Sequence, residues 1–456
     1  MTNKDKYGEV FTPACLVERM LLDGFGDQSR PYCGEPLRIF EPGAGKGIFY
    51  KTIMENYELY FGAKPCQYIL NEINPEHEES LKDILLDGGG RVGNICIQNV
   101  FDVVLDEKVD LIVGNLPFHN GGKAFVPGLA KFHGDDGDVT KPKGIVTIWP
   151  KIIHHCFDSF LKPRGIFFCI IPCIWLKQDR AGIYDLFVRK NELLLLRVFD
   201  CVRANALFGY NCQTPVCYVM VRKRSDGGFH GGCSTLSSVH HFKLYDEDVG
   251  KYIDFPLKIG RCIPTKHASL CLECLQEGEG ANMCYDVVKK VSTLKKGVMD
   301  NVVYTFHKQN KDTLGLLCDY ACKEGEYKVI TGASMDGKWG CGSRGGQDDG
   351  WRNCGLILHG VVSKVEGIYG GKPKLILPHK RLPLFFKDYD GSYSCYGRDM
   401  YVFLCDGGKA QIDSLETYLS SKKVSTIIAE GFTIRMNFIE KYVFQYIPYA
   451  GSSLLM

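Results

Sequence analysis

The sequence lacks any run of about 18–20 consecutive apolar residues, which is the length that a membrane-spanning helix needs. It also lacks the apolar core of a secretory signal peptide, because its first residues, MTNKDKYGEVFTP, are mostly polar. The 21 cysteines scattered over 456 residues are therefore expected to be reduced thiols. These features predict an intracellular, cytoplasmic protein with no membrane partner, and they suit a viral protein that acts in the cytoplasm of its host.

An excess of charge of one sign is lacking too. The 55 lysines and arginines nearly balance the 53 aspartates and glutamates, which leaves a formal net charge of +2. A nucleic-acid partner would have to be bound by local basic patches, since the chain has no global positive field. The 45% of hydrophobic and 24% of charged residues are ordinary for a globular chain and exclude a disordered one. With 456 residues, the chain is long enough for about two to four domains.

Short apolar runs alternate with helical segments between residues 36 and 175. Strand, helix, strand at this spacing is typical of right-handed crossovers and of a parallel sheet with helices on both faces. Two later apolar runs, joined by an expected loop over 202–213, would complete a large mixed sheet. We therefore expect an α/β fold with strands at 37–40, 67–72, 93–98, 109–115, 165–172, 193–201 and 214–223.

The composition changes at residues 224–238, which are rich in glycine and serine and have no apolar period. Beyond residue 300, short β-like runs and one helical stretch predict a second, α+β domain. We expect a catalytic-type domain over residues 1–224, a connecting region over 225–299 and a second domain over 300–456.

The first expected strand runs into a glycine-rich turn, with the sequence FEPGAGKGIF over residues 40–49. Glycines after the first strand of a parallel sheet let the backbone approach a ligand at the carboxyl ends of the strands. The turn lacks the Gly-x4-Gly-Lys-Ser/Thr pattern of a phosphate loop and the G-x-G-x-x-G spacing of dinucleotide sites, which disfavours nucleoside triphosphates and NAD. By itself, the turn is also consistent with a tight connection that binds nothing.

An acidic residue stands at the end of the second expected strand, in Asn71-Glu72-Ile73. A carboxylate at this place can accept hydrogen bonds from both hydroxyls of a ribose. Taken alone, Glu72 fits an exposed acid at a strand end equally well. The glycine turn and the acid on successive strands together favour a ribose-bearing cofactor.

The fourth expected strand ends in Asn115-Leu116-Pro117-Phe118. An exocyclic amine such as adenine N6 is a weak nucleophile, because its lone pair is delocalised into the ring. The Asn115 amide oxygen and the Leu116 carbonyl can accept hydrogen bonds from such an amine and stabilise the positive charge that grows as it is alkylated. The ring of Phe118 can stack on the base. The alternative is a turn that carries a surface aromatic residue.

Together, these segments resemble the N6-adenine DNA methyltransferases of restriction–modification type. Residues 7–13 have the pattern Tyr-Gly-x-x-x-Thr-Pro, the glycine turn follows, and residues 115–118 are a variant of the motif Asn-Pro-Pro-Phe. The motifs follow one another in this order and the recognition domain comes last, which is similar to the order of motifs in the gamma class of the family. The resemblance covers residues 5–225. It implies a Rossmann-like mixed sheet that depends on S-adenosylmethionine, followed by a C-terminal target-recognition domain.

The resemblance also implies which residues bind S-adenosylmethionine. Thr12 and Pro13 would border its methionine end. Glu41 and the backbone of the glycine turn would hold its amino-acid part, and Glu72 would bind its ribose hydroxyls. The expected cofactor-binding residues are Tyr7, Thr12, Pro13, Glu41, Gly43, Gly45, Glu72, Ile73, Asn99 and Asn115.

Two positions depart from the family pattern. Leu116 stands where the family has proline, and this removes some rigidity from the turn. The family usually has an acid that binds the amine of the cofactor's adenine, and counting back from Asn115 gives Asn99 at that place. The oxygen of Asn99 can still accept one hydrogen bond, and Asp102 is a competing candidate.

The activity that the resemblance implies is site-specific, adenine-specific methylation of DNA. A target adenine would be flipped out of the duplex, stack on Phe118 and receive the methyl group directly on N6. Phe208 would pack against the flipped base, or alternatively belong to the core. An RNA adenine methyltransferase and a catalytically idle homologue that binds DNA or cofactor are the alternatives. The resemblance leaves open a cognate restriction endonuclease that is encoded separately.

Basic residues cluster in the second domain, interleaved with apolar and aromatic side chains. Clustered cations suit contacts with phosphates. The candidates for DNA contact are Lys372, Lys374, Lys380 and Arg381, and a solvated hairpin is the alternative. The glycine-rich segment 119–145, directly after the catalytic motif, is expected to close over DNA or cofactor.

Four cysteines, Cys262, Cys271, Cys274 and Cys284, include one C-x-x-C pair. Their other spacings are irregular, whereas structural zinc sites have regular ligand spacings. We therefore expect no metal and keep structural zinc as the alternative.

Overall fold

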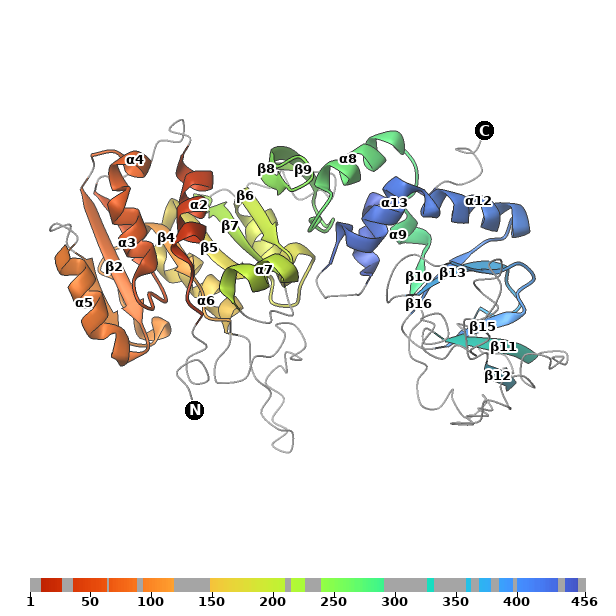
Figure 1. Cartoon of the computed structure of the whole chain (residues 1–456), viewed down its shortest axis with the longest axis horizontal. Helices are drawn as coiled ribbons and strands as arrows, with labels where there is room; N and C mark the ends of the chain where they lie inside the picture. Colours follow the sequence, from red (N-terminus) through yellow and green to blue (C-terminus); the bar gives the residue numbers. More distant parts are fainter. Residues whose placement is uncertain are drawn as a thin grey trace. The chain divides into compact units, whose positions relative to one another are not determined.

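The structure is a computed structural model that describes residues 10–26, 36–63, 65–87, 93–118, 148–209, 215–225, 239–290, 326–331, 358–361, 369–378, 385–396, 400–433 and 439–449. The chain divides into two compact units, whose elements are labelled in Figure 1. The first unit comprises Met1–Thr265 with Ile434–Met436, and the second comprises Lys266–Thr433 with Asn437–Met456.

A nine-stranded mixed sheet forms the centre of the first unit. The strands β1 to β5 run parallel, β7 is antiparallel to both β5 and β6, and β9 is antiparallel to β8. Because β1 lies between β2 and β4, the strand order reverses there and opens a crevice at the carboxyl ends of the strands. In spatial order the strands are β3 (Gly93–Ile97), β2 (Cys66–Glu72), β1 (Leu37–Glu41), β4 (Val109–Asn115), β5 (Leu161–Pro172), β7 (Val216–Arg222), β6 (Glu192–Phe199), β8 (Val239–Asp246) and β9 (Lys251–Lys258).

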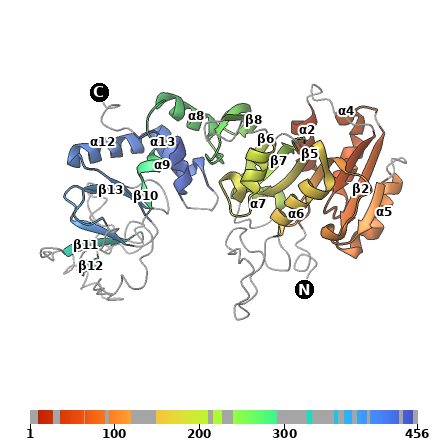
Figure 2. The same cartoon turned by 180° about the vertical axis from the view of Figure 1, so that it is seen from behind.

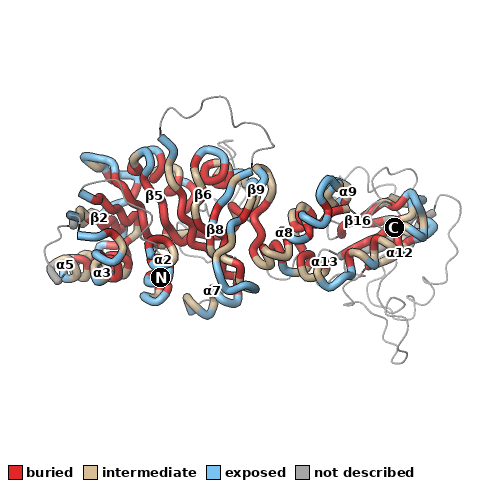
Figure 3. Tube along the Cα trace, turned by 90° about the horizontal axis from the view of Figure 1, so that it is seen from above, coloured by how far each residue is buried: buried red, intermediate tan, exposed pale blue. Residues whose placement is uncertain are grey.

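The apolar runs form strands because both faces of this sheet are covered. Every residue of β1 is buried, which is typical of a parallel strand between two layers of helices. Successive side chains point to opposite faces: Ile39 belongs to the main core cluster, whereas the ring of Phe40 packs on Phe160 with centroids 4.8 Å apart. Figure 3 shows buried residues along the strands.

Helices cover the two faces of the sheet. Apolar residues of the helices on one face join the main core cluster; these are α2 (Ala14–Phe25), α3 (Ile48–Glu55), α4 (Tyr57–Phe61), α5 (Glu78–Asp87) and α7 (Cys201–Phe208). The opposite face carries α6 (Trp149–His155) and the π-helical turns η3 (Cys156–Phe160) and η5 (Asp185–Lys190), seen in Figure 2. Single 3-10 turns lie at η1 (Pro75–His77), η2 (Val100–Asp102) and η4 (Cys173–Leu176).

One expected loop is in fact helical. The segment 202–213 contains most of α7, and this corrects the prediction. Asp200 accepts a hydrogen bond from the main-chain N–H of Arg203 at 2.8 Å and caps the start of the helix. Gly209 ends it in the left-handed conformation, with φ of +66°. Cys201 and Ala204 are its buried residues, and so short an apolar pattern gives little periodic signal.

The first unit continues past residue 224, its expected end. The strands β8 and β9 lie in the region 225–299 that was expected to connect two domains, and they extend the sheet beyond β6. The division between the two units falls at Thr265.

A buried polar cluster ties β9 to the first helix. Asp23 of α2 accepts hydrogen bonds from the hydroxyls of Tyr252 on β9, at 2.7 Å, and of Tyr218 on β7. Arg197 of β6 lies 3.1 Å from the same carboxylate. These contacts neutralise a buried acid, so the added strands are part of the packed unit.

The second unit is of α+β type. A four-stranded sheet has the order β10-β16-β13-β14 and a three-stranded sheet the order β12-β11-β15. Its strands are β10 (Lys289–Lys290), β11 (Glu326–Thr331), β12 (Leu358–Val361), β13 (Lys374–Pro378), β14 (Phe386–Asp388), β15 (Tyr393–Tyr396) and β16 (Met400–Leu404). Its helices and turns are α8 (Ala268–Glu277), α9 (Cys284–Val287), α12 (Gly408–Ser420), α13 (Lys422–Thr426), η7 (Ile427–Gly431) and η8 (Lys441–Tyr446).

The two units confirm the fold class expected from the sequence. The first is built on a mixed α/β sheet, and the second is α+β. Within the described ranges, no helix combines the length and the apolar character needed to cross a membrane.

Candidate functional site

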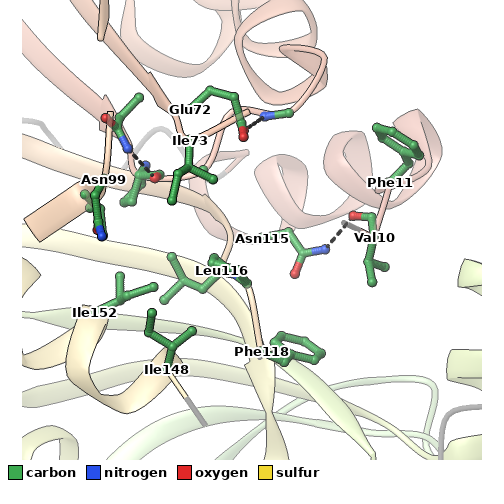
Figure 4. Close-up of a pocket in the computed structure, with 16 residues that line it drawn as sticks. Val10, Phe11, Glu72, Ile73, Asn99, Asn115, Leu116, Phe118, Ile148 and Ile152 are labelled. Atoms are coloured by element: carbon green, nitrogen blue, oxygen red, sulfur yellow. Dashed lines mark hydrogen bonds between the residues drawn. The ribbon is translucent and has the colours of Figure 1, made fainter. Parts of the chain in front are cut away.

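A cleft lies at the carboxyl ends of β1, β2 and β4, where the strand order reverses. The expected motifs of three strands meet there, as Figure 4 shows. The lining residues are Val10, Phe11, Pro42, Gly43, Gly45, Asn71, Glu72, Ile73, Asn99, Val100, Asn115, Leu116, Pro117, Phe118, Ile148 and Ile152. This position is the usual one for a ligand in an open α/β sheet.

The glycine turn after β1 is held by the acid after β2. Gly45 has φ of +54°, which is accessible to glycine at little cost, and its N–H donates to Oε2 of Glu72 at 2.7 Å. The N–H of Asn74 donates to Oε1 of the same carboxylate at 2.8 Å. A carboxylate has about four lone-pair positions, so Glu72 can accept further hydrogen bonds from hydroxyls of a ligand.

The glycine turn approaches the motif after β4 closely at Gly43. A Cβ atom at this position would lie 3.6 Å from Cδ of Pro117 and 3.9 Å from the main-chain oxygen of Asn115. Glycine therefore keeps the cleft open where the first motif approaches the motif after β4.

One end of the cleft is apolar. Ile73 is 47% exposed although it is a large hydrophobic residue, and it lines the cleft together with Asn99 (Figure 4). Ile148 and Ile152 line the same cleft from the start of α6. An exposed aliphatic side chain in a concave site suits one face of a flat, apolar ring.

The asparagine of the motif after β4 has a fixed orientation. Nδ2 of Asn115 donates to Oγ1 of Thr12 at 3.1 Å and to the main-chain oxygen of Val10 at 3.4 Å. Both partners act as hydrogen-bond acceptors, so the amide nitrogen is the atom that faces them. The oxygen Oδ1 is therefore on the other side of the amide. It is buried and has no hydrogen-bond partner among the residues that the structure describes. Figure 4 shows the nitrogen directed towards Val10 and the oxygen away from it.

The rest of the motif completes this wall of the cleft. Leu116 is 2% exposed, and its N–H donates to the main-chain oxygen of Ile170 on β5 at 3.3 Å. This hydrogen bond, which a proline could not make, ties the turn to the sheet. Pro117 lines the cleft, and Phe118 lines it while packing against the main core cluster.

Glu41 lies outside the cleft lining. Its side chain is fully buried, and Oε2 accepts a hydrogen bond from the Tyr68 hydroxyl at 2.8 Å. Burial raises the pKa of Glu41 well above its usual range, a shift that the hydrogen bond from Tyr68 opposes and the charge of Glu72 increases. Oε1 has no partner among the described residues. The carboxyl group is thus held in the interior of the unit by Tyr68.

The last residues of the N-terminal motif lie at the cleft or contact a residue that lines it. Thr12 is 8% exposed and orients Asn115, and Pro13 precedes the first residue of α2. Phe11 is 47% exposed on the cleft, and Nζ of Lys46 lies 4.8 Å from the centre of its ring. Tyr7 lies outside the described residues.

The lining includes residues that the sequence did not single out. Val10 and Phe11 lie inside the N-terminal motif, while Pro42 and Asn71 are neighbours of predicted residues. Membership of these motifs is the sequence signal from which their place at the cleft could have been predicted. The side-chain nitrogen of Asn71 donates to the main-chain oxygen of Pro42 at 3.0 Å. Val100, Ile148 and Ile152 carried no signal, because only the fold brings these apolar residues to the cleft.

Two predicted DNA contacts take part in packing or ion pairing within their own units. Phe208, the last residue of α7, packs against the main core cluster. Lys374 is fully buried in an ion pair with Asp388, so its ammonium is not accessible to a phosphate, and the prediction for this residue is corrected. Burial raises the pKa of Asp388, whereas the charge of Lys374 lowers it.

Of the other predicted DNA contacts in the second domain, the structure describes Lys372 alone. Lys372 is exposed, as expected. Lys380, Arg381 and the segment 119–145 lie outside the described residues.

The cysteines considered for zinc are buried thiols. Burial raises the pKa of Cys274 to about 11. No cluster of three or more His, Cys, Asp or Glu side chains placed to bind a metal occurs within the described part of the chain.

Comparison with known proteins gives one related sequence and several similar structures. No family model matches the chain. It is 25% identical over 221 residues to the type II methyltransferase M.CvrRI of Paramecium bursaria Chlorella virus XZ-6E, covering 48% of this chain and 49% of that protein. The chain thus spans about half the length of this relative.

Similar solved structures include methyltransferases. A methyltransferase subunit of a type I restriction–modification system from Streptococcus thermophilus has 14% identity and a TM-score of 0.36, covering 55% of this chain and 51% of that one. A class I S-adenosylmethionine-dependent methyltransferase from Listeria monocytogenes has 14% identity and a TM-score of 0.34, covering 49% of this chain and 64% of that one.

Proposed function

We propose that this protein is a DNA methyltransferase of restriction–modification type, which transfers the methyl group of S-adenosylmethionine to N6 of an adenine. The observation that carries the proposal is the amide of Asn115. Its nitrogen is bound by Thr12 and Val10, and its buried oxygen lacks a partner among the described residues at the wall of the cleft. Since an unsatisfied buried acceptor costs about 1–3 kcal/mol, this oxygen suits a donor that arrives with the substrate.

The cleft suits S-adenosylmethionine as cofactor. Glu72 retains acceptor capacity for ribose hydroxyls, and Gly43 leaves room beside Pro117 for the amino-acid part. Ile73 would cover one face of the adenine ring, and Asn99 would lie at its edge. The cofactor would supply an electrophilic methyl group.

The chain's own residues would activate the amine by position and charge. Oδ1 of Asn115 would accept a hydrogen bond from the target amine and stabilise the positive charge that grows on nitrogen. Phe118, on the same wall, would stack on the target base after it leaves the duplex. Holding the amine in place lowers the entropic part of the barrier. The methylated nitrogen would then lose its extra proton to water, and Glu72 is the one titratable side chain in the described lining of the cleft.

We propose duplex DNA as the partner and the second unit as the target-recognition domain. The exposed Lys372 is a candidate phosphate contact there. The similarity to a type II methyltransferase supports this substrate, and a separately encoded restriction endonuclease belongs to the same hypothesis. We further expect the protein to act in a cytoplasm.

The test is methyl transfer from radiolabelled S-adenosylmethionine to phage genomic DNA and to structured RNA, with the products digested to nucleosides. Wild type is compared with Asn115→Ala. Asn56→Ala is the matched control, because the Asn56 side chain donates only to its own helix, at Thr52. Label in N6-methyladenine of DNA that is lost in Asn115→Ala and kept in Asn56→Ala would support the proposal.

Other outcomes favour the alternatives. Label in RNA alone would make the protein an RNA methyltransferase. Label in cytosine would contradict the adenine target. Binding of S-adenosyl-L-homocysteine without transfer to any nucleic acid would indicate an idle homologue.

A further inference from the structure

The end of β2 carries an asparagine where a buried parallel strand usually has an apolar residue. Asn71 is 1% exposed and directly follows the buried Ile69 and Leu70. Its Nδ2 donates to the main-chain oxygen of Pro42 at 3.0 Å, whereas its Oδ1 is buried without a partner among the residues that the structure describes. A buried amide with only some of its hydrogen bonds made costs free energy. Packing alone therefore does not explain this residue.

Asn71 lies where the sheet gives way to the glycine turn. The parallel register of β1 and β2 ends with Glu41 opposite Leu70. Beyond this pair, the main-chain oxygen of Asn71 accepts from the N–H of Ala44 at 2.8 Å, and its side chain binds the oxygen of Pro42. Any residue at position 71 can make the first of these hydrogen bonds, but only a side chain that carries a donor can make the second.

The neighbouring acid holds another part of the same turn. Successive side chains of a strand point to opposite faces of the sheet, so Asn71 and Glu72 reach the turn from different sides. Glu72 accepts from the N–H of Gly45 at 2.7 Å. The two side chains thus fix the main chain at Pro42 and at Gly45, before and after Gly43, which lines the cleft.

We propose that Asn71 is a positioning residue for the cofactor. By binding the oxygen of Pro42, its side chain keeps the glycine turn in the conformation that receives the amino-acid part of S-adenosylmethionine. This inference rests on the proposed function, because it takes the turn as the place of that part. Asn71 acts through the main chain of residues 42–45 and has no part in the chemical step.

This role predicts a difference between two ligands. S-adenosyl-L-homocysteine carries the amino-acid part, whereas 5′-methylthioadenosine has the same nucleoside and lacks that part. The nucleoside would be bound by Glu72 and Ile73, whereas the Asn71 side chain holds Pro42. Loss of the hydrogen bond to Pro42 should therefore weaken binding of the first compound more than binding of the second. General loss of stability would not change the ratio of the two affinities.

The test is calorimetric binding of both compounds to the full chain. Asn71→Leu keeps the size of the side chain and removes its donor. We expect it to lower the affinity for S-adenosyl-L-homocysteine about tenfold and that for 5′-methylthioadenosine by less than about threefold. Asn191→Leu is the matched control and should keep the wild-type ratio. Asn191 is also buried in the first unit, outside the cleft lining, and its Nδ2 donates to the oxygen of Leu186 at 2.9 Å.

The outcomes separate this inference from the function on which it rests. A ratio of affinities that changes less than about threefold in Asn71→Leu would overturn the inference and leave the cofactor site in place. If wild type binds only S-adenosyl-L-homocysteine, weaker binding in Asn71→Leu but not in Asn191→Leu supports the inference, and any other result overturns it. Asn71→Ala replaces Asn71→Leu if the latter does not fold. Failure of wild type to bind S-adenosyl-L-homocysteine would overturn both the cofactor site and the inference.

Discussion

The amide of Asn115 is oriented by residues more than a hundred positions earlier in the chain. Thr12 and Val10 accept its two N–H hydrogens, which leaves Oδ1 as an acceptor without a partner among the described residues. A preorganised acceptor stabilises growing charge without reorganising at the moment of reaction. The N-terminal segment therefore acts on the proposed chemistry through Asn115.

Removal of the Thr12 hydroxyl tests this role. Thr12→Val keeps the shape of the side chain but frees the Asn115 amide to rotate, so we expect kcat for DNA methylation to fall about tenfold, the effect of losing roughly 1.4 kcal/mol. Thr52→Val is the matched control, because its buried hydroxyl donates only to Ile48 within α3. Equal loss of kcat in both variants would contradict an orienting role.

The buried Glu41 makes stability depend on pH. Its pKa is raised in the fold above the ordinary 4.5, chiefly by burial, so the folded protein holds a proton that the unfolded chain releases. The stabilising contribution of this protonated form is fully present below pH 4.5 and falls as pH rises above it. Glu41→Gln removes the titration, so its thermal midpoint relative to wild type should rise between pH 5 and pH 8. A constant difference would contradict the shift.

At the scale of elements, the site is made by the ends of strands and not by one continuous segment. The glycine turn after β1 is bound to the acid after β2, and the motif after β4 packs against the same turn near Gly43. Each contact joins neighbouring strands of a parallel sheet, whose carboxyl ends lie at one edge. Cofactor binding should therefore be sensitive to the conformation of this turn.

Gly45→Ala tests the turn. With φ of +54°, an alanine costs about 1–2 kcal/mol in the left-handed conformation, and the hydrogen bond from residue 45 to Glu72 is strained. We expect at least tenfold weaker binding of S-adenosyl-L-homocysteine. Gly250→Ala is the control, since Gly250 has φ of +70° with nothing within 4 Å of an added Cβ. It should lose similar stability and bind normally; weakened binding in both would indicate a general effect.

At the scale of the whole molecule, a net charge of +2 gives no general attraction to DNA. Binding must depend on local cations, and the lysines of the second unit differ in their availability. Lys372 is exposed, whereas Lys374 is buried against Asp388. Two lysines only two positions apart thus differ in their exposure to solvent.

Substitution of these lysines should separate binding from stability. Lys372→Ala should weaken DNA binding, lower the slope of log affinity against log salt by about 1, and change stability by less than about 0.5 kcal/mol. Lys374→Ala should lower the free energy of unfolding by about 3–5 kcal/mol, because it leaves Asp388 buried and unpaired. Fluorescence anisotropy over a salt series and chemical denaturation measure the two effects. A normal salt slope in Lys372→Ala would remove this residue from the DNA contact.

The sequence by itself determined the strands β1 to β7, the fold class and the three motifs of the cleft, because buried apolar runs, glycine turns and polar residues at strand ends are local patterns. Only the tertiary structure decided that α7 is a helix, that β8 and β9 extend the sheet, that Lys374 is buried and that Ile148 and Ile152 line the cleft. It also decided that Nδ2 of Asn115 is bound by Thr12 and Val10, while its Oδ1 has no partner among the described residues. These properties depend on partners distant in sequence or on main-chain geometry, which residue type and spacing do not specify.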